Sequence, residues 1–464
     1  MRLLRAPKGR ANNCGRAAGN TLLRLALPRV PEGLRGCRTR PESHSQRLEV
    51  ELGNGVVDVQ AAAAAAADVP LAEDCVQFDC LGLAQAMVDF SATVDDDLLA
   101  QLGMEKGSRR LIGIDERADV LSLLEGREYA ISAGGSLSNT LVALARLGDA
   151  SSRLGGEPRL RVGMAGLLGA DPLGEFYASQ LRQAGVEVCS PPAAGANTGT
   201  VVVLTSPDAQ RTMLSYLGTP AEVEVDAALE AAIARSRLLV VEGYLWELPN
   251  AAGTISRAIA AAQRHGCVVA MTAGDAGVVE RHHAEMWAAI DQGIDLLFTN
   301  AGEAAALLRH EPAAQQAAPA QQAALHCATG EQLALRLGPH CSVVVVTDGD
   351  RGSYVTALGQ LHCVPPCWLE DAPVDTCGAG DAYAAGLLYG YLRHMDLVGM
   401  GRTAARVASA VIARHGATLT PDAAAALVQA ALAGKGAAQG TARTSAAQQP
   451  GAPAARAPSA PRAA

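Results

Sequence analysis

The chain has 464 residues, of which 49% are apolar, 18% are charged and 3% are aromatic. This length allows one or two globular domains with further segments at the ends. The charge is uneven: residues 1–48 contain eleven Lys or Arg and two Glu, a net +9, so the rest of a chain of net −9 carries −18. No apolar run reaches the length of about 18 residues that a membrane helix needs, so we expect no membrane partner.

Residues 1–73 are expected to form a basic leader and an Ala-rich linker. The leader is rich in Arg, poor in acids and contains Ser, Ala and Leu, which is typical of an organelle transit peptide. The alternative is a disordered basic arm that touches nucleic acid, but charge runs are weak evidence and we expect no direct nucleic-acid partner. The run Ala61 to Ala67 marks the linker.

Short apolar runs alternate with Ala-rich helical patterns between residues 74 and 430. The runs predicted to be strands are Cys80 to Met87, Val201 to Leu204, Leu238 to Val241, Val268 to Met271, Leu296 to Phe298 and Val343 to Val346. Strands that are apolar on both faces and separated by helices predict an α/β fold whose mostly parallel central sheet is covered on both sides. Ligands of such sheets bind beyond the carboxyl ends of the strands.

Two polar positions near the first predicted strand are candidates for binding hydroxyl groups. Asp89 lies at the exit of that strand inside apolar sequence, where a carboxylate can accept hydrogen bonds from the vicinal hydroxyls of a sugar or ribose. The alternative is an ordinary turn residue. Farther on, Gly134 and Gly135 precede the predicted helix Thr140 to Leu147, and Asn139 would offer a donor and an acceptor on its first turn.

Two motifs in the second half of the chain suggest cation and nucleotide binding. Asn300 and Glu303 follow the strand Leu296 to Phe298 on one helical face, and they suit Mg²⁺ bound through water, although Glu303 equally suits a helix cap. Next, Val343 to Val346 leads through Thr347, Gly349 and Gly352 into a second strand, Ser353 to Thr356. A nucleotide could rest on that turn, and an ordinary hairpin explains it as well. Between these motifs, Pro312 to Ala324 predicts a surface insertion at about 310–328.

The stretch from Asp375 to Asp381 predicts a phosphate-binding loop at the start of a helix. Gly378 and Gly380, with Ala379 between them, let backbone N–H groups approach an anion, and the positive end of the following helix points there. A carboxylate at Asp381 would repel that anion unless it collects a proton, which is the role of a general base. After residue 430 the chain is rich in Ala, Pro and Gln, so we expect residues 431–464 to form a disordered tail.

Several alternative sites are excluded. The only Gly-Lys pair, Gly434-Lys435, lacks the first glycine of a P-loop, and Tyr383 stands where a dinucleotide fingerprint needs glycine. The eleven cysteines contain no CxxC pair, which argues against a zinc ribbon and favours a reducing compartment. His282-His283 lacks the spacing of a zinc-binding helix and is given no role.

Taken together, these motifs resemble the PfkB (ribokinase-like) family of small-molecule kinases, whose second signature is similar to Asp375 to Leu388. The resemblance covers about residues 76–425 and includes the segment Gly169 to Gly174. Finer strings, including Pro207 to Met213 and Glu242 to Trp246, resemble the adenosine-kinase-like branch and plastid PfkB proteins of plants and algae.

This resemblance implies a ribokinase-like α/β/α sandwich with a small β lid drawn from about residues 106–114 and 198–216. It implies that Asp381 is the base and that Gly378 to Gly380 form the anion hole. The acceptor site would consist of Asp89, Gly134, Gly135 and Asn139. The ATP and Mg²⁺ site would consist of Asn300, Glu303, Thr347, Gly349 and Gly352, and Asp375 would contact K⁺. Cys377 stands where the family often has Thr, which weakens the K⁺ assignment.

Three functions follow from the sequence. The first is an ATP-dependent kinase that phosphorylates a sugar hydroxyl in line, with Asp381 accepting the proton late in the reaction. The second is a nucleoside kinase, and the third is a kinase-like interaction protein in plastid gene expression or assembly. The resemblance places the protein in the chloroplast, with the mitochondrion as second choice, and it suggests a homodimer through the outer face of the lid.

Overall fold

The computed structural model describes residues 76–208, 210–218, 225–312, 328–369 and 372–446. The predicted leader 1–73, most of the predicted insertion at 310–328 and the end of the predicted tail lie outside these residues. None of the helices within the described ranges has the length and hydropathy to cross a lipid bilayer.

A nine-stranded sheet forms the centre of the fold, with the order β14-β13-β12-β11-β10-β9-β1-β5-β6. Its strands are β1 (Cys80–Gln85), β5 (Val162–Leu167), β6 (Val186–Val188), β9 (Leu238–Val241), β10 (Val268–Thr272), β11 (Leu296–Asn300), β12 (Val343–Thr347), β13 (Ser353–Ala357) and β14 (Gln360–Val364). Every neighbouring pair from β12 to β6 is parallel, and the hairpin β12-β13-β14 is antiparallel. The predicted mostly parallel central sheet is therefore confirmed.

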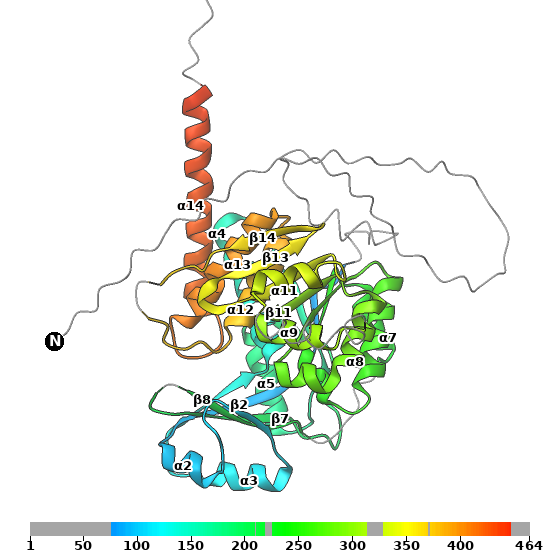
Figure 1. Cartoon of the computed structure of the whole chain (residues 1–464), viewed down its shortest axis with the longest axis vertical. Helices are drawn as coiled ribbons and strands as arrows, with labels where there is room; N and C mark the ends of the chain where they lie inside the picture. The colour runs from blue at the N-terminus through cyan, green and yellow to red at the C-terminus, as the bar shows by residue number, and fades with distance from the viewer. Residues whose placement is uncertain (1–75, 209, 219–224, 313–327, 370–371, 447–464) are drawn as a thin grey trace, which may run out of the picture. The chain divides into compact units, whose positions relative to one another are not determined.

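Helices cover both faces of this sheet (Figure 1). One apolar cluster contains residues of α4 (Ser136–Gly155), α5 (Pro172–Gln183), α12 (Ala379–Leu392), α13 (Leu397–Ile412) and α14 (Pro421–Ala446). The other contains residues of α6 (Ala227–Ala234), α7 (Ala251–Arg264), α8 (Ala276–Gly293), α9 (Ala301–Arg309) and α11 (Gly330–Leu337). Aspartate side chains cap several of these helices, such as Asp275 at α8. The helix α14 continues to Ala446 and so includes the first residues of the predicted tail 431–464.

A second, five-stranded sheet forms the lid, with the order β3-β8-β7-β2-β4. Its strands are β2 (Met87–Thr93), β3 (Arg109–Leu111), β4 (Tyr129–Gly134), β7 (Gly199–Thr205) and β8 (Arg211–Tyr216). The two predicted lid segments supply β3, β7 and β8, but β2 and β4 were missed. The single core strand predicted from Cys80 to Met87 is wrong at its end, because the chain leaves the central sheet at Ala86. Asp89 consequently lies on the lid strand β2.

The outer face of the lid is largely covered by two short helices, α2 (Asp96–Gln101) and α3 (Ile114–Ser122) (Figure 1). Their apolar side chains join Phe90 and Val202 in one buried cluster, and Arg117 Nε donates to Thr200 Oγ1 at 2.8 Å. This cover explains why Val201 to Leu204 is apolar on both faces. The two helices also occupy much of the surface that the predicted lid dimer would use. On the edge strand β4, by contrast, Tyr129 and Ile131 are each 44% exposed.

Candidate active site

The predicted anion loop forms the start of α12. Gly378 has a φ of 73°, and a Cβ there would lie 2.4 Å from the carbonyl oxygen of Ala417, so only glycine fits. A Cβ on Gly380 would meet no atom within 4 Å, which leaves open space in front of the first turn. The helix N-terminus therefore directs positive potential toward an accessible volume, as an anion requires, while the N–H of Ala379 donates to the carbonyl oxygen of Thr376 at 3.3 Å.

Asp381 lies in the first turn of α12 and is held by α4. Its carboxylate accepts hydrogen bonds from Ser136 Oγ at 2.6 Å and from Asn139 Nδ2 at 3.0 Å. Its backbone carbonyl accepts a further one from Thr140 Oγ1 at 3.2 Å. Burial raises the pKa of Asp381 to about 6, and the bonds from Ser136 and Asn139 oppose that rise. The carboxylate is thus oriented, and it is more basic than an exposed aspartate.

Asp89 lies on the lid strand β2, where the charges of Arg211 and Asp381 act on it. Gly134 makes room for it, because a Cβ at Gly134 would lie 2.0 Å from Asp89 Oδ1. This oxygen is buried, and none of the described residues donates a hydrogen bond to it. Burial raises the pKa of Asp89 to about 7, the charge of Arg211 lowers it, and the charge of Asp381 raises it. A buried acceptor without a donor beside a basic carboxylate suits a ligand that carries hydroxyl groups.

The predicted acceptor loop is the start of α4. Gly135 is the N-cap residue and has a φ of 92°, which glycine adopts without strain. Gly134 lies against Asp89, and Gly135 and Asn139 follow it at the start of α4, while their role in binding an acceptor stays a prediction. We expected Asn139 to contact the acceptor, and in the structure its side-chain amide donates a hydrogen bond to Asp381.

Asn300 and Glu303 form a capping box at the start of α9. Asn300 Oδ1 accepts from the N–H of Glu303 at 2.9 Å, and Glu303 Oε2 accepts from the N–H of Asn300 at 2.9 Å. The alternative of a helix cap is thus present in the structure. Burial chiefly raises the pKa of Glu303 to about 8, with the negative charges of Asp275 and Asp381 adding to the rise.

These residues fit Mg²⁺ bound through water. The negative charges of Asp275 and Asp381 act on Glu303, and a divalent cation bound there would relieve that repulsion. Within the described ranges, no three His, Cys, Asp or Glu side chains converge closely enough to ligate a metal directly. Asn300 and Glu303 thus lie together at the start of α9, and their role in holding hydrated Mg²⁺ stays a prediction.

The second predicted nucleotide motif is the turn between β12 and β13. Thr347 is the register partner of Asn300, which sets the two nucleotide motifs side by side at the carboxyl ends of β11 and β12. Gly349 has a φ of 60° and open space around its Cβ position, whereas a Cβ on Gly352 would lie 2.3 Å from the carbonyl oxygen of Val364. Gly349 can therefore face a ligand, and Gly352 is required for packing.

Asp375 binds three donors. It accepts from the N–H groups of Cys377 at 2.9 Å and Gly416 at 2.8 Å, and it forms an ion pair with Arg211 of the lid. The guanidinium group of Arg211 thus supplies a positive charge beside Asp375, the residue for which the sequence suggested a contact with K⁺.

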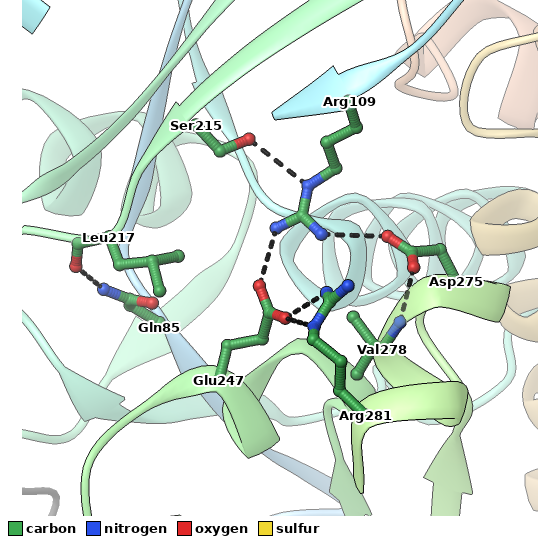
Figure 2. A network of polar contacts seen from close by, with 8 residues as sticks. All are labelled: Gln85, Arg109, Ser215, Leu217, Glu247, Asp275, Val278 and Arg281. Carbon is green, nitrogen blue, oxygen red and sulfur yellow. Dashed lines mark hydrogen bonds and ion pairs between the residues drawn. The ribbon is translucent and has the colours of Figure 1, made fainter. Parts of the chain in front are cut away.

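Arg109 connects the lid to the core in a network that sequence reasoning missed. Figure 2 shows its guanidinium group between Asp275 and Glu247, at 2.9 and 3.3 Å, while Arg281 binds Glu247 from the core side. The same group lies 4.6 Å from the centre of the Tyr244 ring. In the sequence, Arg109 is recognisable only as a cation on a short polar strand. Its partners could not be identified there, because they lie more than a hundred residues away.

Glu242 is another buried site residue without an assigned role in the sequence. It follows β9 and is 2% exposed. Its side chain accepts from the N–H groups of Gln85 and Leu137. In the sequence, this residue is recognisable only as a single glutamate after an apolar strand.

Comparisons with known proteins agree with this arrangement. Residues 108–424 match the family described as pfkB family carbohydrate kinase. The adenosine kinase of Sinorhizobium meliloti has a similar structure, with a TM-score of 0.64 and 30% identity, covering 76% of this chain and 100% of that one. A probable sugar kinase of Rhizobium etli gives a TM-score of 0.64 and 26% identity, covering 77% and 99%. A 5-dehydro-2-deoxygluconokinase of Clostridium perfringens is 25% identical over 304 residues, which are 63% of this chain and 82% of that protein.

Proposed function

The chain belongs to the pfkB family of carbohydrate kinases, and on that premise we propose that it transfers the γ-phosphate of ATP to a hydroxyl group of a sugar, with Asp381 as general base. One observation carries the proposal: Asp381 is oriented by Ser136 and Asn139 at the open mouth of α12, beside the unpartnered Oδ1 of Asp89. In this proposal, a base, an anion site and a hydroxyl-binding carboxylate would act on one bound acceptor.

The mechanism follows from these positions. Phosphoryl transfer passes through a loose transition state, so most of the acceleration comes from alignment and from stabilising charge. Asp89 would hold the acceptor hydroxyls, and the N–H groups from Gly378 to Gly380 would bind the phosphoryl oxygens. Mg²⁺, held through water near Asn300 and Glu303, would neutralise the ATP phosphates. Asp381 would take the hydroxyl proton as the new O–P bond forms, because a carboxylate cannot ionise an alcohol beforehand.

A nucleoside is the second candidate acceptor. It is favoured by the likeness to an adenosine kinase at 30% identity over the whole of that protein. A nucleobase needs a flat surface for stacking, and the ring of Tyr244 at the edge of the site is already contacted by Arg109. We therefore prefer a sugar.

We further propose that the basic leader directs the chain to the plastid, with the mitochondrion second, and that K⁺ assists the anion site. We also propose a homodimer through the lid. A further proposal is a separate role as an interaction protein in plastid gene expression or assembly. Import assays test the plastid location, and a K⁺ titration of ADP release tests the role of the cation. Sedimentation tests the homodimer, and rescue of a mutant phenotype by Asp381→Asn tests the interaction role. Rescue equal to that by wild type would establish the interaction role.

The direct test is ADP release by the full-length chain with ATP, Mg²⁺ and K⁺ across sugars, sugar phosphates and nucleosides. Asp381→Asn is the matched control, because it keeps the size of the side chain and removes the base. A sugar that stimulates ADP release in wild type alone supports the proposal. Stimulation by nucleosides only would select the second candidate.

A further inference from the structure

Glu242 is a charged residue in an apolar setting. It follows the strand β9, whose four residues are all buried, and it is itself 2% exposed. Burial raises the pKa of its carboxyl group to about 7, the hydrogen bonds from Leu137 and Gln85 oppose the rise, and the charge of Asp381 adds to it. A buried carboxylate is costly unless its oxygens receive hydrogen bonds, so its partners indicate its role.

The partners of Glu242 lie on the two segments that flank the acceptor site. Oε1 accepts from the N–H of Leu137 at 3.0 Å, in the first turn of α4, where backbone donors lack partners within the helix. Oε2 accepts from the N–H of Gln85 at 3.2 Å, at the end of β1. The side chain of Gln85 in turn donates to the carbonyl oxygen of Leu217 at the exit of the lid strand β8 (Figure 2). One carboxylate therefore links β1, α4 and, through Gln85, the lid.

The backbone that carries Glu242 has little freedom to move. Its own N–H donates to the carbonyl oxygen of Leu83 at 3.1 Å. The N–H of Gly243 donates to Thr272 Oγ1 at 3.1 Å, and a Cβ on Gly243 would lie 2.4 Å from the carbonyl oxygen of Thr272. The carboxylate is thus anchored to the central sheet and can act as a fixed point for α4.

We propose that Glu242 is a positioning residue for phosphoryl transfer, which fixes the first turn of α4 and with it the two hydrogen bonds that orient Asp381. This inference rests on the proposed kinase function. The geometry supports it because Ser136 and Asn139, the donors to Asp381, lie in the same turn as Leu137. Without the acceptor at Glu242, the turn would lose its tether to the sheet, and Asp381 would lose its alignment.

The experiment compares Glu242→Gln with a matched control, Asp295→Asn. Glutamine keeps the size of the side chain but turns an amide group toward one backbone N–H. Like Glu242, Asp295 is a carboxylate that accepts from a backbone N–H, that of Val269 at 2.8 Å, but it is only partly buried and precedes β11 at the opposite end of the strands. Hydrogen–deuterium exchange of peptides covering residues 132–141 should become about tenfold faster in Glu242→Gln, because one buried hydrogen bond is lost. Asp295→Asn should leave it unchanged.

Kinetics with ATP and an acceptor found in the ADP-release screen provide the second readout. Glu242→Gln should lower kcat about 10- to 100-fold, the effect expected of a small misalignment, with the KM for ATP unchanged. Glu242→Asp, which keeps the charge and both acceptor oxygens, should restore part of the rate. Thermal unfolding confirms that each variant is folded.

The outcomes separate the two claims. Unchanged exchange in Glu242→Gln, or faster exchange with an unchanged kcat, would overturn the positioning role. If the wild type releases no ADP with any acceptor, the proposed function fails, and the exchange comparison then decides by itself whether Glu242 tethers α4.

Discussion

Replacing Gly134 with alanine tests how the lid presents Asp89 to an acceptor. The added Cβ would lie 2.0 Å from Asp89 Oδ1 and 2.2 Å from Cγ, closer than any real contact. Gly134 does not have a positive φ, so its backbone accepts alanine without strain. The substitution therefore acts through Asp89, whose carboxyl group must turn away from its buried position.

The expected size of the effect follows from the two changes. Crowding a packed site costs about 1–3 kcal/mol in the free energy of unfolding. Loss of a hydrogen bond to a charged group costs about 1.5–3 kcal/mol, which corresponds to a roughly 10- to 150-fold fall in kcat/KM for the acceptor. The KM for ATP should stay near that of the wild type, because Asn300 and Thr347 lie on other strands.

The assay is the initial rate of ADP release at varied acceptor and varied ATP, beside thermal unfolding. Gly253→Ala is the matched control, because its Cβ in the exposed part of α7 would meet no atom within 4 Å. A folded Gly134→Ala variant with wild-type kcat/KM for the acceptor would refute the role of Asp89.

Three other predictions use the charges around the site. ADP release should fall as the pH is lowered through about 6, because the pKa of Asp381 is raised to about 6 and only the ionised carboxylate accepts a proton; a flat profile between about pH 5 and 8 would contradict this. The folded chain holds the proton of Glu303 up to about pH 8, whereas the unfolded chain releases it near about 4.3, so the stability from this group is lost as the pH rises through that window. The melting temperature should thus be higher at about pH 5.5 than at pH 8, with a smaller difference in Glu303→Gln; an equal or reversed difference would count against it. Arg109→Ala should speed hydrogen exchange in residues 106–114 and raise the KM for the acceptor, while Arg281→Ala, whose pairing with Glu247 stays within the core, should do neither; equal effects of the two changes would exclude a specific tether of the lid by Arg109.

Local features of this fold could be predicted well from the sequence. The strand β9 matches the predicted run Leu238 to Val241 residue for residue. The anion loop before Asp381 and the pair Asn300 and Glu303 were found because each is set by neighbours within a few residues, through glycine conformation or a helix cap.

The division between core and lid could not be predicted in the same way. The run from Cys80 through Val88 is apolar except for Gln85, and one polar residue does not by itself indicate that the chain changes sheets at Ala86. Pairs such as Arg211 with Asp375, or Glu242 with Leu137, join residues more than a hundred positions apart and depend on the finished topology. The candidate ligand-binding motifs could be predicted from the sequence, whereas the charged side chains that contact them depend on the fold.

The most direct test of the proposed chemistry is the rate of acceptor-dependent ADP release by Asp381→Asn. Asparagine keeps a similar shape and can still bind Ser136, but it cannot accept the hydroxyl proton. The rate should fall roughly 10²- to 10⁴-fold while the fold and ATP binding are retained. A variant that turns over as fast as the wild type would show that Asp381 is not the base.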